Sequence, residues 1–197
     1  AIRSLVRSGR LGTVVTLSAS ENLDPRHAGS FFRRWQRFRR NNGGLLNAKC
    51  CHDLDLVAWI LGSEPMEVSA MGGRRIFVPD PSLPDRCSEC PIRERCLYAF
   101  DYAYYERNFR SFHSLSDLCV YNSDKDIVDH ESLLIRMTDG VLARFELNLF
   151  GAEETRRMEI HGTAATLEAD FLRGSLRIAD LRDGRVDEIG TPEELAV

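Results

Sequence analysis

The C-terminal third of the chain shows the alternation of apolar and polar residues that is typical of β-strands. From residue 129 onward, alternating runs end at short glycine-containing turns such as Asp139-Gly140 and Asp183-Gly184. A period of two indicates half-buried strands, and Asp-Gly steps favour tight turns between antiparallel neighbours. The predicted strands span 132–137, 141–150, 156–161, 165–171 and 175–181.

The N-terminal part mixes helical and strand patterns. A long apolar stretch lies between Asn42 and Gly62, residues that favour helix ends, and its apolar residues lie nearly all round the predicted helix. We therefore expect that helix to be buried on most sides. The predicted elements are helices over 2–6 and 45–61 and strands over 12–19 and 66–78. Together they predict one α+β domain over residues 1–197, an open, mostly antiparallel sheet with helices on one face.

Composition and charge narrow the functional classes. No apolar run approaches the roughly 20 residues that span a bilayer. The net charge of −4 argues against nucleic-acid binding, because such domains usually carry a basic excess. The chain opens on Ala1 without a signal peptide, so we expect further sequence before it. Six cysteines without a secretory signal predict a cytoplasmic protein with reduced thiols.

Ionisable residues interrupt the apolar stretch over 45–61. Lys49 lies three residues before His52 and four before Asp53, so a continuous helix places them on one face. Such residues cost free energy on a buried helix unless they pair or face a cleft. Two interpretations stay open: a functional site, or a structural ion pair between Lys49 and Asp53.

Several motifs resemble those of the Gfo/Idh/MocA oxidoreductases, a family similar to glucose-fructose oxidoreductase and inositol dehydrogenase. Ala165 stands where this family usually has glycine, but the resemblance covers nearly the whole chain. The motifs that carry it are Ser8-Gly9-Arg10-Leu11-Gly12, Gly43-Gly44-Leu45-Leu46, His52-x-x-Asp55, Trp59-x-Leu61-Gly62 and Ile160-His161-Gly162-Thr163.

The resemblance implies the C-terminal half of a two-domain enzyme whose N-terminal Rossmann domain binds NAD or NADP. The chain has no Gly-x-Gly-x-x-Gly motif, so we assign it no cofactor-binding residue and expect the Rossmann domain as a missing partner. In the family, an Asp-x-x-x-His pair carries acid–base chemistry. The histidine corresponds to His52, whereas Ala48 takes the place of the aspartate, so we assign His52 and the neighbouring Lys49 as candidate catalytic residues.

The resemblance also implies a substrate class and a partner. We expect a sugar, sugar derivative or cyclic polyol as substrate, and a homo-oligomer formed through the open face of the sheet. Because Ala48 replaces the aspartate, a non-catalytic, metal-stapled binding or assembly module is the alternative.

Three cysteines lie close together in a proline-rich excursion predicted over about 79–100. Cys87, Cys90 and Cys96 have the spacing of a structural zinc site, where metal binding contributes folding energy to a segment with few apolar residues. Cys51 is the favoured fourth ligand. The alternatives for that ligand are Cys50, Cys119 and His113. An iron–sulfur cluster, free thiols or a disulfide stay open as well.

Two polar segments are candidates for contacts with substrate. The first surrounds Trp35 with arginines that form either an anion-binding rim or solvated surface. The second precedes the strand at 132 and is either a substrate-facing segment or a polar turn. The arginines of the first segment are Arg33, Arg34, Arg37, Arg39 and Arg40. The residues that we assign to substrate binding are Trp35, Arg37, Asp126, Asp129 and His130.

Overall fold

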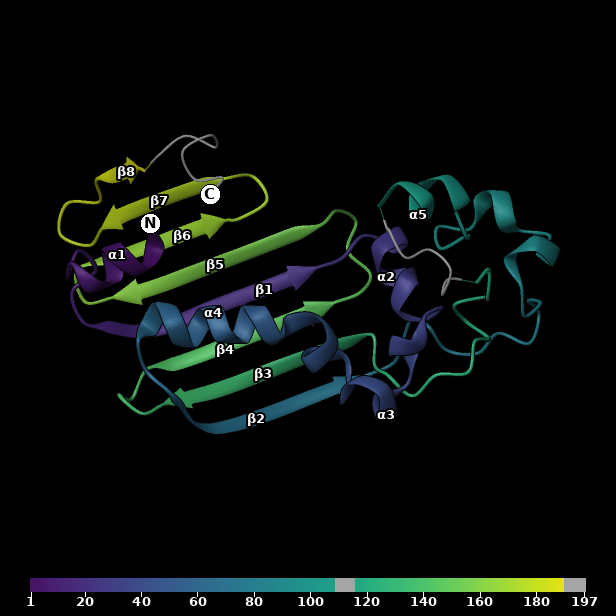
Figure 1. Cartoon of the computed structure of the whole chain (residues 1–197). Helices are drawn as coiled ribbons and strands as arrows, with labels where there is room; N and C mark the ends of the chain where they lie inside the picture. Colours follow the sequence, from purple (N-terminus) through teal and green to yellow (C-terminus); the bar gives the residue numbers. More distant parts are fainter. Residues whose placement is uncertain (109–115, 190–197) are drawn as a thin grey trace.

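A single open sheet forms the centre of the protein. The computed structural model describes residues 1–108 and 116–189, and its sheet has the strand order β2-β3-β4-β1-β5-β6-β7-β8 (Figure 1). Neighbouring strands are antiparallel except β1 and β4, which are parallel. The strands are β1 (Val14–Asn22), β2 (Pro65–Gly73), β3 (His130–Met137), β4 (Leu142–Asn148), β5 (Thr155–Gly162), β6 (Ala165–Asp170), β7 (Ser175–Asp180) and β8 (Val186–Glu188). The predicted α+β fold is confirmed.

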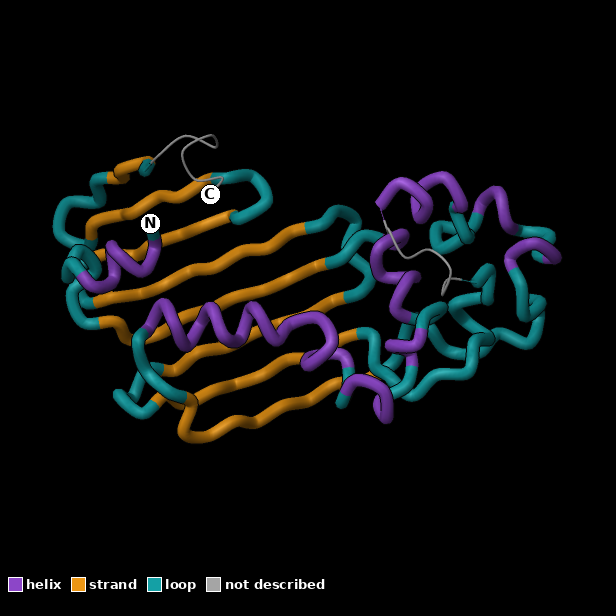
Figure 2. The backbone as a smooth tube through the Cα atoms, viewed as in Figure 1, coloured by secondary structure: helices purple, strands orange, loops and turns teal. Residues whose placement is uncertain are grey.

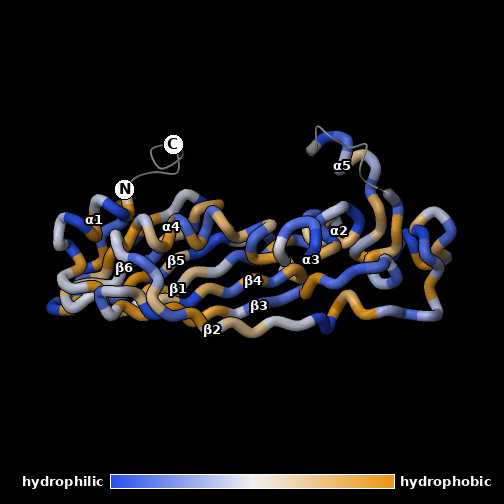
Figure 3. Tube along the Cα trace, turned by 60° about the horizontal axis from the view of Figure 1, so that its bottom comes forward, coloured by the Kyte–Doolittle hydropathy of each residue, from blue (hydrophilic) through white to orange (hydrophobic). Residues whose placement is uncertain are grey.

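Helices cover one face of this sheet. α1 (Ile2–Arg7) and α4 (Cys51–Leu61) lie across that face, as the edge-on view in Figure 3 shows. α2 (Pro25–Phe31), α3 (Arg39–Asn42) and α5 (Tyr102–Asn108) lie beyond one end of the strands (Figures 1 and 2). Among the described residues, no helix is long and apolar enough to cross a bilayer.

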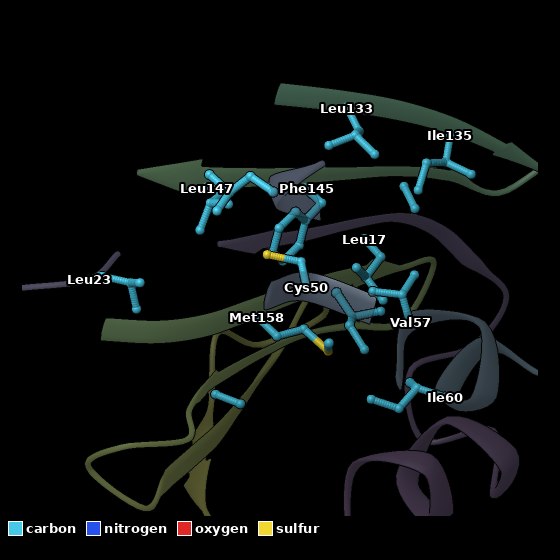
Figure 4. Packing of buried hydrophobic residues seen from close by; sticks show 14 of the residues in the cluster. Leu17, Leu23, Cys50, Val57, Ile60, Leu133, Ile135, Phe145, Leu147 and Met158 are labelled. Atoms are coloured by element: carbon cyan, nitrogen blue, oxygen red, sulfur yellow. The ribbon is translucent and has the colours of Figure 1, made fainter. Parts of the chain in front are cut away.

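The register of the strands decides which side chains form the core. Leu17 of β1, Phe145 of β4 and Met158 of β5 point to the helix-covered face and are almost fully buried (Figure 4). They pack in one cluster with Val57 and Ile60 of α4. Full burial of each such side chain stabilises the fold by about 1.5–3 kcal/mol.

The predicted helix over 45–61 is present, but it is neither continuous nor buried on most sides. Residues Leu46–Cys50 form a π-helical turn, and the α-helix begins at Cys51 and ends at Gly62, whose φ of 67° suits glycine. Trp59 is 51% exposed and packs under the guanidinium of Arg3. The helix packs against the sheet on one face and meets α1 at its C-terminal end, so the rest of its surface is exposed.

An excursion over residues 74–129 separates β2 from β3 and lies with α2 and α3 beyond the end of the sheet (Figure 2). The predicted strand over 66–78 ends early, at Gly73. The reason is Asp129, whose carboxylate accepts hydrogen bonds from the backbone N–H groups of Arg75, Ile76 and Phe77 and draws them away from the sheet.

Two short 3-10 turns and α5 form the regular structure of the excursion. The turns span Cys87–Glu89 and Arg93–Arg95, within the segment predicted to be irregular. An aromatic cluster packs the excursion onto the chain after α2, with Phe77 lying 4.1 Å from Phe32 and 4.8 Å from Tyr98 between ring centroids. These rings belong to the main core of the domain, whereas Cys87, Phe100 and Tyr105 form a small second cluster within the excursion.

Candidate functional site

The π-helical turn places Lys49 over the end of β1. Its Nζ lies 2.7 Å from Oε1 of Glu21, and both side chains are nearly buried. The predicted ion pair between Lys49 and Asp53 is wrong. The physical reason is that the π-turn ends at Cys50, so the two residues do not share the continuous α-helix on which residues four apart face each other.

Asp53 pairs instead with a residue of the sheet. Arg156 of β5 places its Nε 2.6 Å from Oδ1 of Asp53, which is 5% exposed. Nε2 of His52 lies 3.1 Å from the other carboxylate oxygen, Oδ2, and the His52 side chain is 51% exposed. The angle between these groups is not that of a hydrogen bond, so Oδ2 is buried without a hydrogen-bond partner among the described residues.

We call these five side chains the α4 cluster: Glu21, Lys49, His52, Asp53 and Arg156. Two cationic side chains face two carboxylates, so the buried charges are balanced. Within the described residues, oxygen and nitrogen atoms of Glu21, His52 and Asp53 lie within 4.8 Å of one another, a spacing that would suit a metal ion. Because Lys49 and Arg156 already neutralise both carboxylates, the charges here do not require an added cation.

Sequence reasoning missed Glu21 and Arg156. A signal for Glu21 was present, because it follows Leu17 and Ala19 at every second position of a strand, on the side that faces the core. A carboxylate in that phase needs a partner. Arg156 gave no such signal, since a charged residue near the start of a strand is commonly exposed.

His130 and Glu131 lie at the start of β3, and the side chain of Glu131 reaches the π-helical turn Leu46–Cys50. Nδ1 of His130 is 2.7 Å from Oδ1 of Asp129, and the His130 side chain is 36% exposed. Burial raises the pKa of Glu131, while the backbone N–H of Leu46 opposes that shift. Gly72 makes room for Glu131, because a Cβ there would stand 2.4 Å from its Cγ.

The structure gives three of the predicted substrate-binding residues contacts within the protein. Asp129 has no exposed surface, so its carboxylate is not accessible to a ligand, and that assignment is corrected. Asp126 accepts a hydrogen bond from the backbone N–H of Arg39 at 2.5 Å, and Arg37 donates to the carbonyl oxygen of Asp124. Trp35 remains 48% exposed.

The arginines around Trp35 differ in their surroundings, so they form neither a continuous anion-binding rim nor a uniformly solvated surface. Arg33 is 1% exposed and is one of the largest fully buried side chains. Arg37 and Arg40 place their guanidinium groups over the Phe38 ring, at 4.4 and 4.3 Å from its centroid. Spacing in the sequence could not separate the buried member from its neighbours.

Four cysteines of the excursion line one small cavity, and Cys51 is not among them. Cys87, Cys90, Cys96 and Cys119 share this cavity, whereas Cys51 is exposed on α4. Cys51, predicted as the fourth zinc ligand, therefore does not line this cavity, whereas Cys119, one of the alternatives, does. Burial raises the pKa of Cys96, and the three neighbouring thiols raise it further. His113 lies outside the described residues.

A comparison with known protein families shows which family this chain belongs to. The GFO/IDH/MocA C-terminal domain family matches residues 1–168. The chain belongs to this family. A Bacillus subtilis (strain 168) protein, YteT, whose name assigns it provisionally to the oxidoreductases, is 27% identical over 90% of this chain. The match covers 46% of YteT, so the chain spans about half the length of this curated relative.

Solved structures share the fold of this Gfo/Idh/MocA domain. Levoglucosan dehydrogenase in complex with NADH and L-sorbose superposes with a TM-score of 0.64 at 16% identity, over 96% of this chain and 43% of its own. An oxidoreductase domain protein from Kribbella flavida gives 0.63 at 21% identity, over 95% and 44%. UDP-N-acetylglucosamine 3-dehydrogenase from Acidithiobacillus ferrooxidans gives 0.56 at 16%, over 95% and 42%.

The described part of this Gfo/Idh/MocA domain does not fit a dinucleotide. Its one parallel strand pair joins β1 to β4, and no Gly-x-Gly-x-x-Gly turn leads from a strand into a helix. A pyrophosphate needs the backbone N–H groups of such a turn. The side chains of the α4 cluster can themselves bind a polar ligand and move a proton.

Proposed function

We propose that this chain is the substrate-binding and oligomerisation domain of an NAD(P)-dependent oxidoreductase that acts on a sugar, sugar derivative or cyclic polyol. The α4 cluster carries this proposal. In it, the exposed imidazole of His52 lies beside two buried ion pairs, Lys49–Glu21 and Arg156–Asp53. Family membership supports the reaction class. The named activities of two fold relatives, levoglucosan dehydrogenase and UDP-N-acetylglucosamine 3-dehydrogenase, support the substrate class.

The cluster suits the proton half of an alcohol oxidation. When an alcohol becomes a ketone, the carbon loses a hydride and the oxygen loses a proton. In this proposal His52 accepts that proton, because its side chain is half exposed and within reach of a bound hydroxyl. Asp53 lies beside the ring and stabilises the imidazolium that forms, while Arg156 keeps the carboxylate in place.

Lys49 supplies a second polar contact. Its side chain is 13% exposed and its ammonium group donates to Glu21, so two of its N–H bonds remain for a substrate oxygen. A hydrogen bond from a cation to the reacting oxygen stabilises negative charge that develops as the proton leaves. His130 lies at the start of β3 with a partly exposed ring and is the best placed of the predicted contacts to meet a sugar hydroxyl.

The experiment is an activity screen on the intact polypeptide that carries this domain together with its nucleotide-binding part. NAD⁺ and NADP⁺ are each paired with aldoses, anhydrosugars, nucleotide sugars and inositols, and nicotinamide reduction is followed by absorbance. We expect reduction with at least one carbohydrate. If carbohydrates bind to the protein but none is oxidised with either nucleotide, the non-catalytic module becomes the better interpretation.

The face of the sheet opposite α4 supports the proposed oligomer. Here Leu134 is 55% exposed, and a hollow of about 1240 Å³ runs over the strands. Arginine and carboxylate side chains both line the hollow, so the face offers charges of both signs to a second copy, as a two-fold interface requires. The charged residues of the hollow are Arg144, Glu146, Arg157, Glu159, Glu168, Asp170, Arg173, Arg177 and Glu188.

Sedimentation tests this interface. We expect a dimer or larger assembly at micromolar concentration, and Leu134→Asp should dissociate it. Leu181→Asp is the matched control, because Leu181 is 62% exposed in the turn after β7 and does not line the hollow. A monomeric wild-type chain, or equal dissociation by both variants, would remove the support for a dimer through this face.

A further inference from the structure

The four cysteines in the excursion are brought together by its backbone. Arg86 and Leu118 form an isolated antiparallel bridge, with hydrogen bonds of 2.8 Å from Cys87 N to Asp117 O and from Cys119 N to Asp85 O. Cys87 and Cys119 therefore flank one bridge from opposite sides of the excursion, and both are buried.

The other two cysteines hold equivalent positions. Cys90 follows the 3-10 turn Cys87–Glu89, and Cys96 follows the 3-10 turn Arg93–Arg95. Both have nearly the same backbone dihedrals, with φ near −83° and ψ of 122°. Each turn thus ends on a thiol that lines the shared cavity, so the spacing of two and five residues between the first three cysteines has a structural basis.

A buried cation stands beside these thiols. Arg33 is 1% exposed, and its guanidinium donates to the carbonyl oxygens of Leu118 and Tyr98, to Oη of Tyr105 and, at 3.6 Å, to Sγ of Cys87. It forms no salt bridge with a carboxylate among the residues that the structure describes. A buried cation without a counter-charge is costly, and the sulfur that it contacts, Sγ of Cys87, belongs to the cysteine group.

We propose that Cys87, Cys90, Cys96 and Cys119 bind one Zn²⁺ as four thiolates, with Arg33 as the buried counter-charge of the site. Four thiolates around a divalent cation leave two net negative charges, which a neighbouring guanidinium partly balances. The cavity that they line is about 10 Å³, close to the space that one water occupies, so it accommodates a single ion and not an iron–sulfur cluster.

Binding includes a local closure of the site. Within the described residues, the three ligand atoms that lie within 4.8 Å of one another belong to Glu21, His52 and Asp53 of the α4 cluster. No three cysteine sulfurs in the described residues lie that close together. Zinc–sulfur bonds of about 2.3 Å would draw the thiolates inward, and each thiol releases its proton as it binds. The ion would then join the two 3-10 turns to the bridge at Cys119.

The test on the wild-type chain needs no substitution. Protein expressed with added zinc is analysed for metal content, and X-ray absorption at the zinc edge reports the ligands. We expect about one zinc per chain with four sulfur ligands. No zinc after expression, together with no uptake when zinc is added to the reduced protein, would overturn the proposal. Zinc bound by nitrogen and oxygen would overturn it too, and would point to the α4 cluster.

Paired cysteine variants identify the ligands. Cys119→Ser should weaken zinc binding by at least 10-fold in competition with a chromophoric chelator, because one of four thiolates is lost. Cys51→Ser is the matched control and should bind zinc as the wild type does. If Cys119→Ser is poorly folded, Co²⁺ added to the wild type distinguishes four thiolates from three by its charge-transfer and ligand-field absorption. Retention by Cys119→Ser with loss in Cys51→Ser would overturn the assignment.

A last arm tests the counter-charge. Arg33→Met should lower zinc affinity in the same competition assay, whereas Arg33→Lys, which keeps the charge, should recover part of it. Free thiols are counted in parallel with and without reductant. Fewer reactive thiols in the absence of reductant, with no metal bound, would mean that the cysteines pair as disulfides, and this too would overturn the proposal.

Discussion

Two groups of buried charges in this domain are stabilised in different ways. In the α4 cluster, Lys49 and Arg156 each pair with a carboxylate side chain. In the excursion, Lys125 and Asp129 are satisfied mostly by backbone groups: Lys125 donates to two carbonyl oxygens, and Asp129 accepts from three N–H groups. A partly exposed imidazole lies beside a buried carboxylate in both groups, His52 in the first and His130 in the second, so the groups differ in what holds the carboxylate itself.

The difference indicates what each group does. A carboxylate bound to backbone N–H groups fixes the path of the chain, because those N–H groups have no other partner. A carboxylate bound to a flexible arginine or lysine can exchange that partner for a ligand. We therefore expect substitutions in the α4 cluster to change activity or ligand binding, and substitutions in the excursion to change stability.

The largest expected effect is on catalysis. In the intact oxidoreductase that we propose, His52→Asn should lower kcat by about 10²- to 10⁴-fold, because a general acid–base group is lost, while the melting temperature changes little. His161→Asn, an exposed histidine on β5 remote from the cluster, should keep full activity. Turnover in His52→Asn equal to that of the wild type would refute the role of this imidazole.

Asp129→Asn should destabilise the excursion by about 3–5 kcal/mol, because an amide cannot accept all the hydrogen bonds that reach the buried carboxylate. The two tryptophans separate the regions: Trp35 lies near the excursion and Trp59 on α4. With single-tryptophan variants, urea unfolding should shift more for the Trp35 signal than for the Trp59 signal. Asp55→Asn, an exposed change, is the control; an equal loss in both would place the effect elsewhere.

Lys49→Met should destabilise the chain because it leaves Glu21 buried without a cation, and adding Glu21→Gln should recover part of the loss. The coupling free energy from this double-mutant cycle should be about 1–3 kcal/mol. The exposed pair Arg136–Glu67, which does not line the hollow, should give about 0.2–1 kcal/mol. Equal coupling in the two cycles would mean that burial does not strengthen the first pair.

The smallest effect is a pH dependence from Lys125. Burial, and then the charge of Arg74, lower the pKa of Lys125 from 10.5 to about 8. Between about pH 8 and 10 the unfolded chain then holds more protons, so stability should rise with pH, by an amount on the order of 1–2 kcal/mol. Chemical denaturation across this range should show the rise in the wild type and not in Lys125→Met. A rise that persists in the variant belongs to another group.

The alternation of apolar residues was sufficient to predict most of the sheet. The strands observed as β3 to β7 differ from the predicted ranges by a few residues at their ends, and the helix over 45–61 ends at Gly62 as expected. The early end of β2 could not be predicted, because it depends on a carboxylate far along the chain, Asp129, which captures the backbone after Gly73.

The candidate site was predicted only in part. His52 and Lys49 follow from the helix and the family resemblance, but their partners Glu21 and Arg156 come from strands that only the folded sheet brings beneath the helix. The π-turn, which decides that Lys49 faces Glu21, leaves no mark in residue spacing. The pairing of Cys119 with the other three cysteines is likewise set by the bridge at Leu118, which no local pattern indicates.

The position of β1 has a consequence for the synthesis of the protein. β1 leaves the ribosome before both of its neighbours, β4 and β5, which follow the whole excursion in the sequence. The apolar residues of β1 therefore have no neighbouring strand while the helices and the whole excursion are translated. Contacts between such distant segments form slowly and expose apolar surface meanwhile. A nascent chain of this domain should therefore depend on chaperones until β5 has emerged.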